Sequence, residues 1–126
     1  MTPQIPVSWG ELIDKITILE IKAERLSSES ARANVRRELE RLSAVAASAE
    51  HPKLIALKSA LKRVNETLWR IEDDIRDKEA KQCFDAEFIE LARAVYRNND
   101  ERGRLKAEIN AALSSELVEE KQYVRY

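Results

Sequence analysis

The chain has 126 residues and a formal net charge of −1, with 22 lysines and arginines against 23 aspartates and glutamates. Charged residues make up 36% of the sequence and hydrophobic ones 44%, while there are only two glycines and three prolines. This balance is typical of long helices with a charged outer face and disfavours folds built from sheets and tight turns. We therefore expect a single all-α domain covering residues 1–126.

The same composition argues against several classes of function. Acidic and basic residues are mixed along the whole chain, so there is no broad basic field for nucleic acid. The single cysteine, Cys83, excludes an intramolecular disulfide and a multi-cysteine zinc site. The N-terminus has no signal-peptide pattern, and no apolar stretch reaches membrane length. We expect a cytoplasmic protein with no metal, cofactor, nucleic-acid or membrane partner.

The first two predicted helices follow a short extended arm, residues 1–8, which contains two prolines. Ser8 is expected to be an N-cap, with Glu11 completing a capping box. The first helix should run from Trp9 to about Ser27, and its wide apolar face suggests that two neighbours cover it. After a serine-rich break, a second helix of about 20 residues has a thin seam rich in alanine, so it should be the least firmly held.

The longest apolar repeat of the chain predicts a third helix, with Pro52 in its first turn and its end near Lys81. Seven large residues follow a spacing of three and four along it: Leu54, Leu57, Leu61, Val64, Leu68, Ile71 and Ile75. Asp85 is the expected N-cap of a fourth helix from about Ala86 to Leu113, followed by a tail over 114–126. The short connection forces an antiparallel arrangement. The predicted fold is an elongated antiparallel helical bundle with a coiled-coil-like long hairpin, and the first helix lies in the hairpin groove.

The fourth helix departs from its own apolar repeat near its middle. Asn98 and Arg102 occupy positions where the repeat expects apolar residues. The register of the hairpin places Asn65 and Glu66 at the same height, and the first helix could add Thr17 and Glu20. We therefore predict a central polar layer from two helices, composed of Asn65, Glu66, Asn98, Asn99, Asp100 and Arg102. Such a layer either fixes the register of the helices or forms a ligand pocket between them.

Other residue clusters give weaker signals. The acidic group Glu72, Asp73, Asp74, Asp77 and Glu79 is interspersed with basic residues and is interpreted as a solvent-facing helix surface. A di-iron bundle would need repeated Glu-x-x-His motifs, but the chain has one histidine. In the tail, Tyr123 and Tyr126 are hard to explain by core packing, and a docking segment for a partner is one interpretation.

Four segments resemble those of a known family: 8–19 (SWGELIDKITIL), 64–76 (VNETLWRIEDDIR), 95–100 (VYRNND) and 115–121 (SELVEEK). The family comprises short bacterial proteins catalogued only as a domain of unknown function. The likeness extends over almost the whole chain. It implies a small helical cytoplasmic protein and supplies no activity or catalytic residues to transfer.

Two classes of function fit these features. A non-catalytic interaction or scaffold protein, acting as a homodimer through helix faces, needs only long helices, mixed charge and a tail available for docking. The alternative is a small-ligand protein or enzyme in which Arg102 holds an anionic group in the polar layer. The sequence favours the first, so catalysis is not expected.

Overall fold

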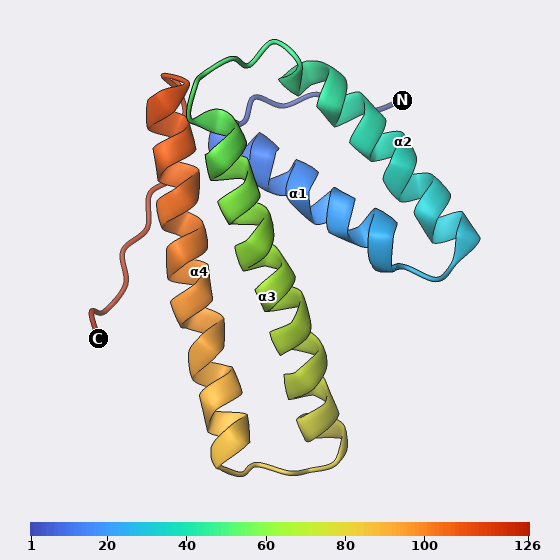
Figure 1. Ribbon diagram of the computed structural model, residues 1–126, viewed down its shortest axis with the longest axis vertical. Coiled ribbons are helices and arrows are strands. Elements are labelled where there is room, and N and C mark those ends of the chain that lie inside the picture. Colours follow the sequence, from blue (N-terminus) through green and yellow to red (C-terminus); the bar gives the residue numbers. More distant parts are fainter.

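A computed structural model describes all 126 residues and contains four helices and no strand (Figure 1). The helices are α1 (Trp9–Arg25), α2 (Glu29–Ala46), α3 (Leu54–Ala80) and α4 (Ala86–Ala112). The predicted all-α class is confirmed, and the predicted boundaries agree with the structure to within about two residues at most helix ends. None of the helices combines the length and apolar character needed to span a membrane.

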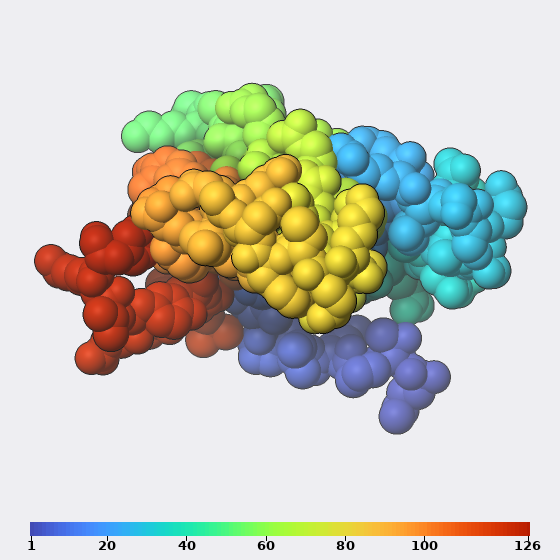
Figure 2. Space-filling view, turned by 90° about the horizontal axis from the view of Figure 1, so that it is seen from below, coloured from blue at the N-terminus to red at the C-terminus, as the bar shows by residue number.

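Helices α3 and α4 form a long antiparallel hairpin, and each has 27 residues. Helix α1 packs against both of them, as predicted, and also against α2. Helix α2 packs on α1 alone, so it lies outside the three-helix core. The closed end of the hairpin extends beyond α1 and α2 (Figure 1). Seen from that end, α2 lies to one side of the hairpin and the C-terminal tail to the other (Figure 2).

The helix starts follow from their capping residues. The hydroxyl of Ser8 accepts a hydrogen bond from the Glu11 amide at 3.1 Å, and the carboxylate of Asp85 accepts one from the Phe88 amide at 3.0 Å. Both caps are as predicted. The second half of the capping box is absent, because the Glu11 carboxylate binds Lys106 of α4 instead.

The predicted position of Pro52 in the first turn of α3 is wrong. The helix begins two residues later, at Leu54. The cause is a turn closed by His51, whose carbonyl accepts from the Leu54 amide at 3.0 Å and whose ring nitrogen accepts from the Lys53 amide at 3.1 Å.

The core lies at the open end of the hairpin, where α1 covers it. Its six buried residues are Leu12, Ile13, Ile16, Leu61, Leu105 and Ile109. Of the seven residues in the α3 seam, only Leu61 and Ile71 are buried. The seam thus has one continuous spacing, but only Leu61 belongs to the buried core that α1 helps to form.

Candidate functional site

A polar layer crosses the three-helix core and contains a buried ion pair. The Arg102 guanidinium donates to Asp14 through Nε at 2.9 Å and through Nη2 at 2.5 Å. The Asn65 amide donates to Asp14 Oδ1 and to the Thr17 hydroxyl, both at 2.9 Å. Asp14 is 1% exposed and Thr17 is completely buried. The carboxylate therefore has three donors and no contact with bulk water, which is the condition under which a buried charge is tolerated.

Each helix brings its member of the layer to the centre for a local reason. On α1, Gly10, Asp14, Thr17 and Ile21 follow the three-four spacing of an inward-facing line, and all four are buried. Asn65 of α3 and Arg102 of α4 both bind the Asp14 carboxylate. The hairpin therefore places them at the same level, as the predicted register requires. Sequence reasoning missed Asp14. The available signal was its position in that inward line, together with the need of a buried arginine for a counter-ion.

The layer is narrower than predicted. Asn65 and Arg102 belong to it, and so does Thr17 of α1. Three predicted members and the suggested Glu20 make other contacts: Glu66 lies 4.0 Å from Arg25, Asn98 donates to the Ala94 carbonyl, Asp100 accepts from Tyr126, and Glu20 lies 3.4 Å from Lys58. Asn98 lies on the same face of α4 as Arg102, but its amide is taken by the carbonyl one turn earlier in its own helix.

A cleft of about 280 Å³ adjoins the layer. Its lining residues come from the C-terminal half of α1 and from α3 and α4, and α1 diverges from α3 toward its C-terminal end (Figure 1). Its walls are mostly apolar, and its polar members include two amides and the guanidinium of the layer. The lining residues are Ile18, Ile21, Asn65, Leu68, Trp69, Glu72, Val95, Asn99 and Arg102.

Arg102 connects the layer to this cleft. Its side chain is 30% exposed, and Nη1 has no partner within the protein. The hydrogen bonds to Asp14 raise the pKa of Arg102 above its ordinary value and outweigh the opposing effect of burial. Because the Nε–Nη2 edge is taken by Asp14, the Nη1–Nη2 edge still presents N–H groups for a second acceptor.

A second polar group joins α1, α4 and the tail. The Lys106 ammonium, largely buried, donates to Glu11 at 2.8 Å and to Glu119 of the tail at 2.9 Å. Burial lowers the pKa of Lys106, but these two hydrogen bonds outweigh it, so the pKa lies above its ordinary value. The Asn110 side chain accepts from the Gly10 amide at 2.7 Å, which ties the start of α1 to the end of α4.

The tail follows α4 back along the molecule (Figure 1). Tyr126 donates a hydrogen bond to Asp100 and packs edge-on against Tyr96, with ring centroids 5.1 Å apart. Tyr123 lines a second hollow, of about 240 Å³, between α4 and the tail. Both predicted docking residues remain largely exposed, at 72% for Tyr123 and 77% for Tyr126. A docking role for them stays a prediction.

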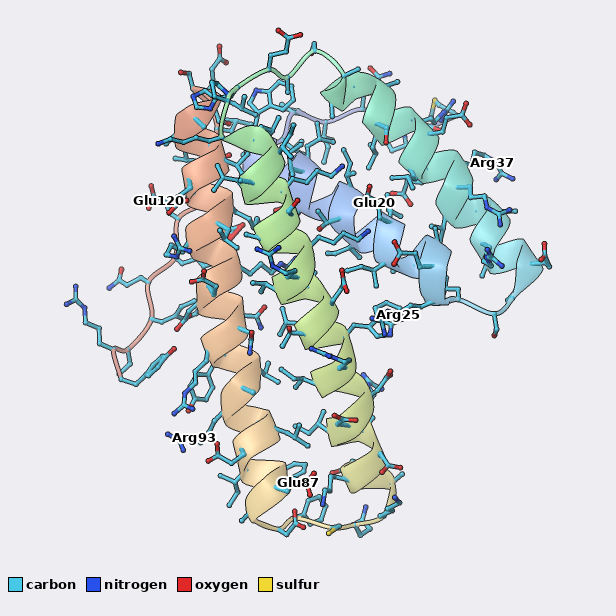
Figure 3. The ribbon with its side chains drawn as sticks, in the orientation of Figure 1. Glu20, Arg25, Arg37, Glu87, Arg93 and Glu120 are labelled. Carbon is cyan, nitrogen blue, oxygen red and sulfur yellow. The ribbon has the colours of Figure 1, made fainter.

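The remaining charged side chains lie mainly on the outside of the helices. Figure 3 shows Arg37 of α2 and Arg93 of α4 pointing away from the bundle. In the acidic group of α3, Glu72 pairs with Arg76 at 2.5 Å and Asp77 with Lys81 at 2.8 Å. No group of three His, Cys, Asp or Glu side chains lies close enough together to hold a metal ion.

Comparison with known proteins gives one match. A model described as a family of unknown function (DUF6165) matches residues 3–125. The chain belongs to this family. Membership agrees with the resemblance seen in the sequence and assigns no activity. No curated protein and no solved structure matches the chain.

Proposed function

We propose that the protein is a non-catalytic helical binding protein that holds a small anionic ligand in the cleft between α1, α3 and α4. One observation carries this proposal: a buried carboxylate fixes one edge of the Arg102 guanidinium, Nη1 has no partner within the protein, and the side chain lines an open cleft. An arginine oriented in this way loses little conformational freedom when a ligand binds.

The surroundings of Arg102 support binding. The Asn99 side-chain amide also lines the cleft and can donate to an anion, whereas both N–H groups of the Asn65 amide are already taken by Asp14 and Thr17. Apolar walls surround these few convergent polar groups, which is the usual composition of a small-molecule site.

The cleft offers little for catalysis. Its only titratable lining residues are Glu72 and Arg102. Glu72 is an exposed carboxylate paired with Arg76, and Asp14 is enclosed by its three donors. A general base must be free to reach a substrate proton, which neither carboxylate is.

The test compares two neighbouring asparagines. Asn99 lines the cleft, whereas Asn98 donates to the carbonyl of its own helix. Thermal unfolding of wild type, Asn99→Asp and Asn98→Asp should be followed with acetate, inorganic phosphate, small dicarboxylates, nucleotides and nucleotide sugars. A bound anion stabilises the wild type by about 2.7 kcal/mol at 100 times its Kd. Asn99→Asp should lose this stabilisation through charge repulsion, and Asn98→Asp should retain it.

Arg102→Ala is a less suitable variant for this test. It leaves Asp14 buried without its counter-ion and should cost about 3–5 kcal/mol of stability whether or not a ligand binds. Absence of stabilisation by every anion, or equal stabilisation of both aspartate variants, would refute the proposed site.

A second candidate function is self-association, and a specific surface favours it. Ile89 and Tyr96 are 55% and 43% exposed on the N-terminal half of α4, with Ala92 between them, and the tail covers part of Tyr96 through Tyr126. In an antiparallel α4–α4 contact about a twofold axis, Ile89 of one copy meets Tyr96 of the other, and the small Ala92 allows the helices to approach. We propose a homodimer, and hence a scaffold role, through this stripe.

Two isoleucines test the homodimer. Ile89→Glu should convert the dimer to a monomer, whereas Ile55→Glu, at an 82% exposed site near the start of α3, should not. Light scattering over a concentration series measures the mass. A wild type that remains monomeric at high micromolar concentration, or equal effects of both substitutions, would contradict this candidate.

A further inference from the structure

We infer that the ligand of the cleft is a small monocarboxylate whose body is a single ring, as in an arylacetate or arylpropionate. This inference rests on the proposed function and specifies the chemical class of its ligand. Its three supports are the volume of the cleft, the composition of its walls and its charge.

The volume of the cleft fits a small ligand. The cleft measures about 280 Å³ and is open to solvent, and an apolar cavity of about 150 Å³ holds one benzene ring. A ring with a short carboxylate arm therefore fits within it.

The walls favour an apolar and flat body. Five of the nine lining residues are hydrophobic, and they come from all three helices: Ile18, Ile21, Leu68, Trp69 and Val95. The indole of Trp69 offers a face or edge for stacking with a ring. The remaining four lining residues are polar: Asn99 and Arg102, which can donate to an anion, together with Asn65 and Glu72.

The charge favours a single negative group. Arg102 is the only cation that lines the cleft, and the buried Asp14 carboxylate is its counter-ion, so the cleft offers N–H donors without excess positive charge. Glu72 adds a negative charge to the lining. A phosphate dianion or a dicarboxylate would meet repulsion there, whereas one carboxylate can accept from the Nη1–Nη2 edge of Arg102 in the planar geometry that guanidinium groups favour.

The two tryptophans provide the readout. Trp69 lines the cleft, while Trp9 lies at the start of α1, where its backbone amide donates to Ser115. In a 15N-labelled wild-type protein the two indole N–H signals can be assigned with a Trp9→Phe variant. Phenylacetate and 3-phenylpropionate, titrated to about 10 mM because small ligands reach at best moderate affinity, should shift the Trp69 signal in a saturable way. The Trp9 signal should stay in place.

Three matched probes separate the contributions of the negative charge, the ring and the anion geometry to binding. Acetate has the charge without the ring, phenylacetamide has the ring without the charge, and inorganic phosphate has a different anion geometry. Each should bind at least about tenfold more weakly than phenylacetate, because each lacks one major contact and a loss of about 1.4 kcal/mol raises Kd tenfold. Asn99→Asp should weaken phenylacetate binding by a similar factor, and Asn98→Asp should leave it within about twofold.

The outcomes distinguish this inference from the function on which it rests. Acetate or phosphate binding as tightly as phenylacetate would overturn the ring monocarboxylate and leave anion binding in place. Phenylacetamide binding equally well would show an apolar site without anion recognition and overturn both. An unchanged Trp69 signal with all probes would also overturn both.

Discussion

At Gly10 the start of α1 lies directly against the backbone of α4. A Cβ atom built at this position would lie 2.5 Å from the Lys106 carbonyl oxygen and 3.0 Å from Asn110 Oδ1. The other glycine, Gly103, is also inside a helix, but a Cβ there would meet nothing nearer than Lys121 Nζ at 3.6 Å. Glycine at position 10 therefore allows α1 and α4 to approach closely, whereas position 103 has space for a side chain.

We predict opposite effects for alanine at these positions. Gly10→Ala should destabilise the protein by about 1–3 kcal/mol, because the carbonyl of α4 cannot move without shifting the helix. Gly103→Ala should stabilise it by up to about 1 kcal/mol through the better helix propensity of alanine. Denaturant unfolding of both variants measures the difference. Equal and small effects would show that α1 can move away from α4 at little cost.

The residues of the site were only partly predictable. Arg102 was found because a charged residue interrupts an apolar repeat, and Asn65 because the hairpin register follows from a short connection. Asp14 was missed because its neighbours Leu12, Ile13 and Ile16 form a wide apolar face, and the pattern does not show that a carboxylate within this face is buried. The position of α1 along the hairpin depends on contacts such as Gly10–Asn110, for which no local sequence rule exists.

Among the elements, α2 has the smallest share of the core. Val35 is its only buried residue, and it packs on α1 alone. The alanine-rich seam of this helix correctly predicted weak burial. The existence and order of all four helices followed from spacing and capping residues, whereas the turn at His51 did not, since it depends on a side-chain hydrogen bond.

Native-state hydrogen exchange should therefore show α2 opening before the other helices. Amides of α2 should exchange with a lower free energy of opening than those of α1 and of the covered ends of α3 and α4. Val35→Ala, which removes two methyl-sized groups, should lower the free energy of unfolding by about 1–2 kcal/mol, and Leu61→Ala should lower it by about 2–5 kcal/mol. Protection of α2 equal to that of α3 would mean that a further contact, such as a second copy, holds it.

At the scale of the whole molecule, acid should release the tail from α4. The hydrogen bond from Lys106, followed by that from Lys121, lowers the pKa of Glu119 below its ordinary 4.5. A carboxylate with a lowered pKa stabilises the folded state above its unfolded pKa, and this contribution is lost as the pH falls through the folded value. The tail should thus be held at neutral pH and loosen in acid, as the pH falls through the lowered pKa of Glu119.

Limited proteolysis of the tail at pH 7 and in acid can measure this release. Glu119→Gln should make the tail sensitive at both pH values and remove most of the dependence on pH. Glu120→Gln is the control, because Glu120 lies next in the chain and points away from the helices (Figure 3). A tail that stays protected in acid would show that the contact between Tyr126 and Asp100 alone is sufficient.

The bond between Gly10 and Asn110 also bears on how the chain is made. Its two residues are 100 positions apart, so α1 is translated long before its partner exists. Until α4 leaves the ribosome, α1 has its own Ser8 cap but no covering surface on α4. A nascent chain truncated before residue 100 should therefore keep α1 open to chaperones, and the native core should close only after α4 has been synthesised.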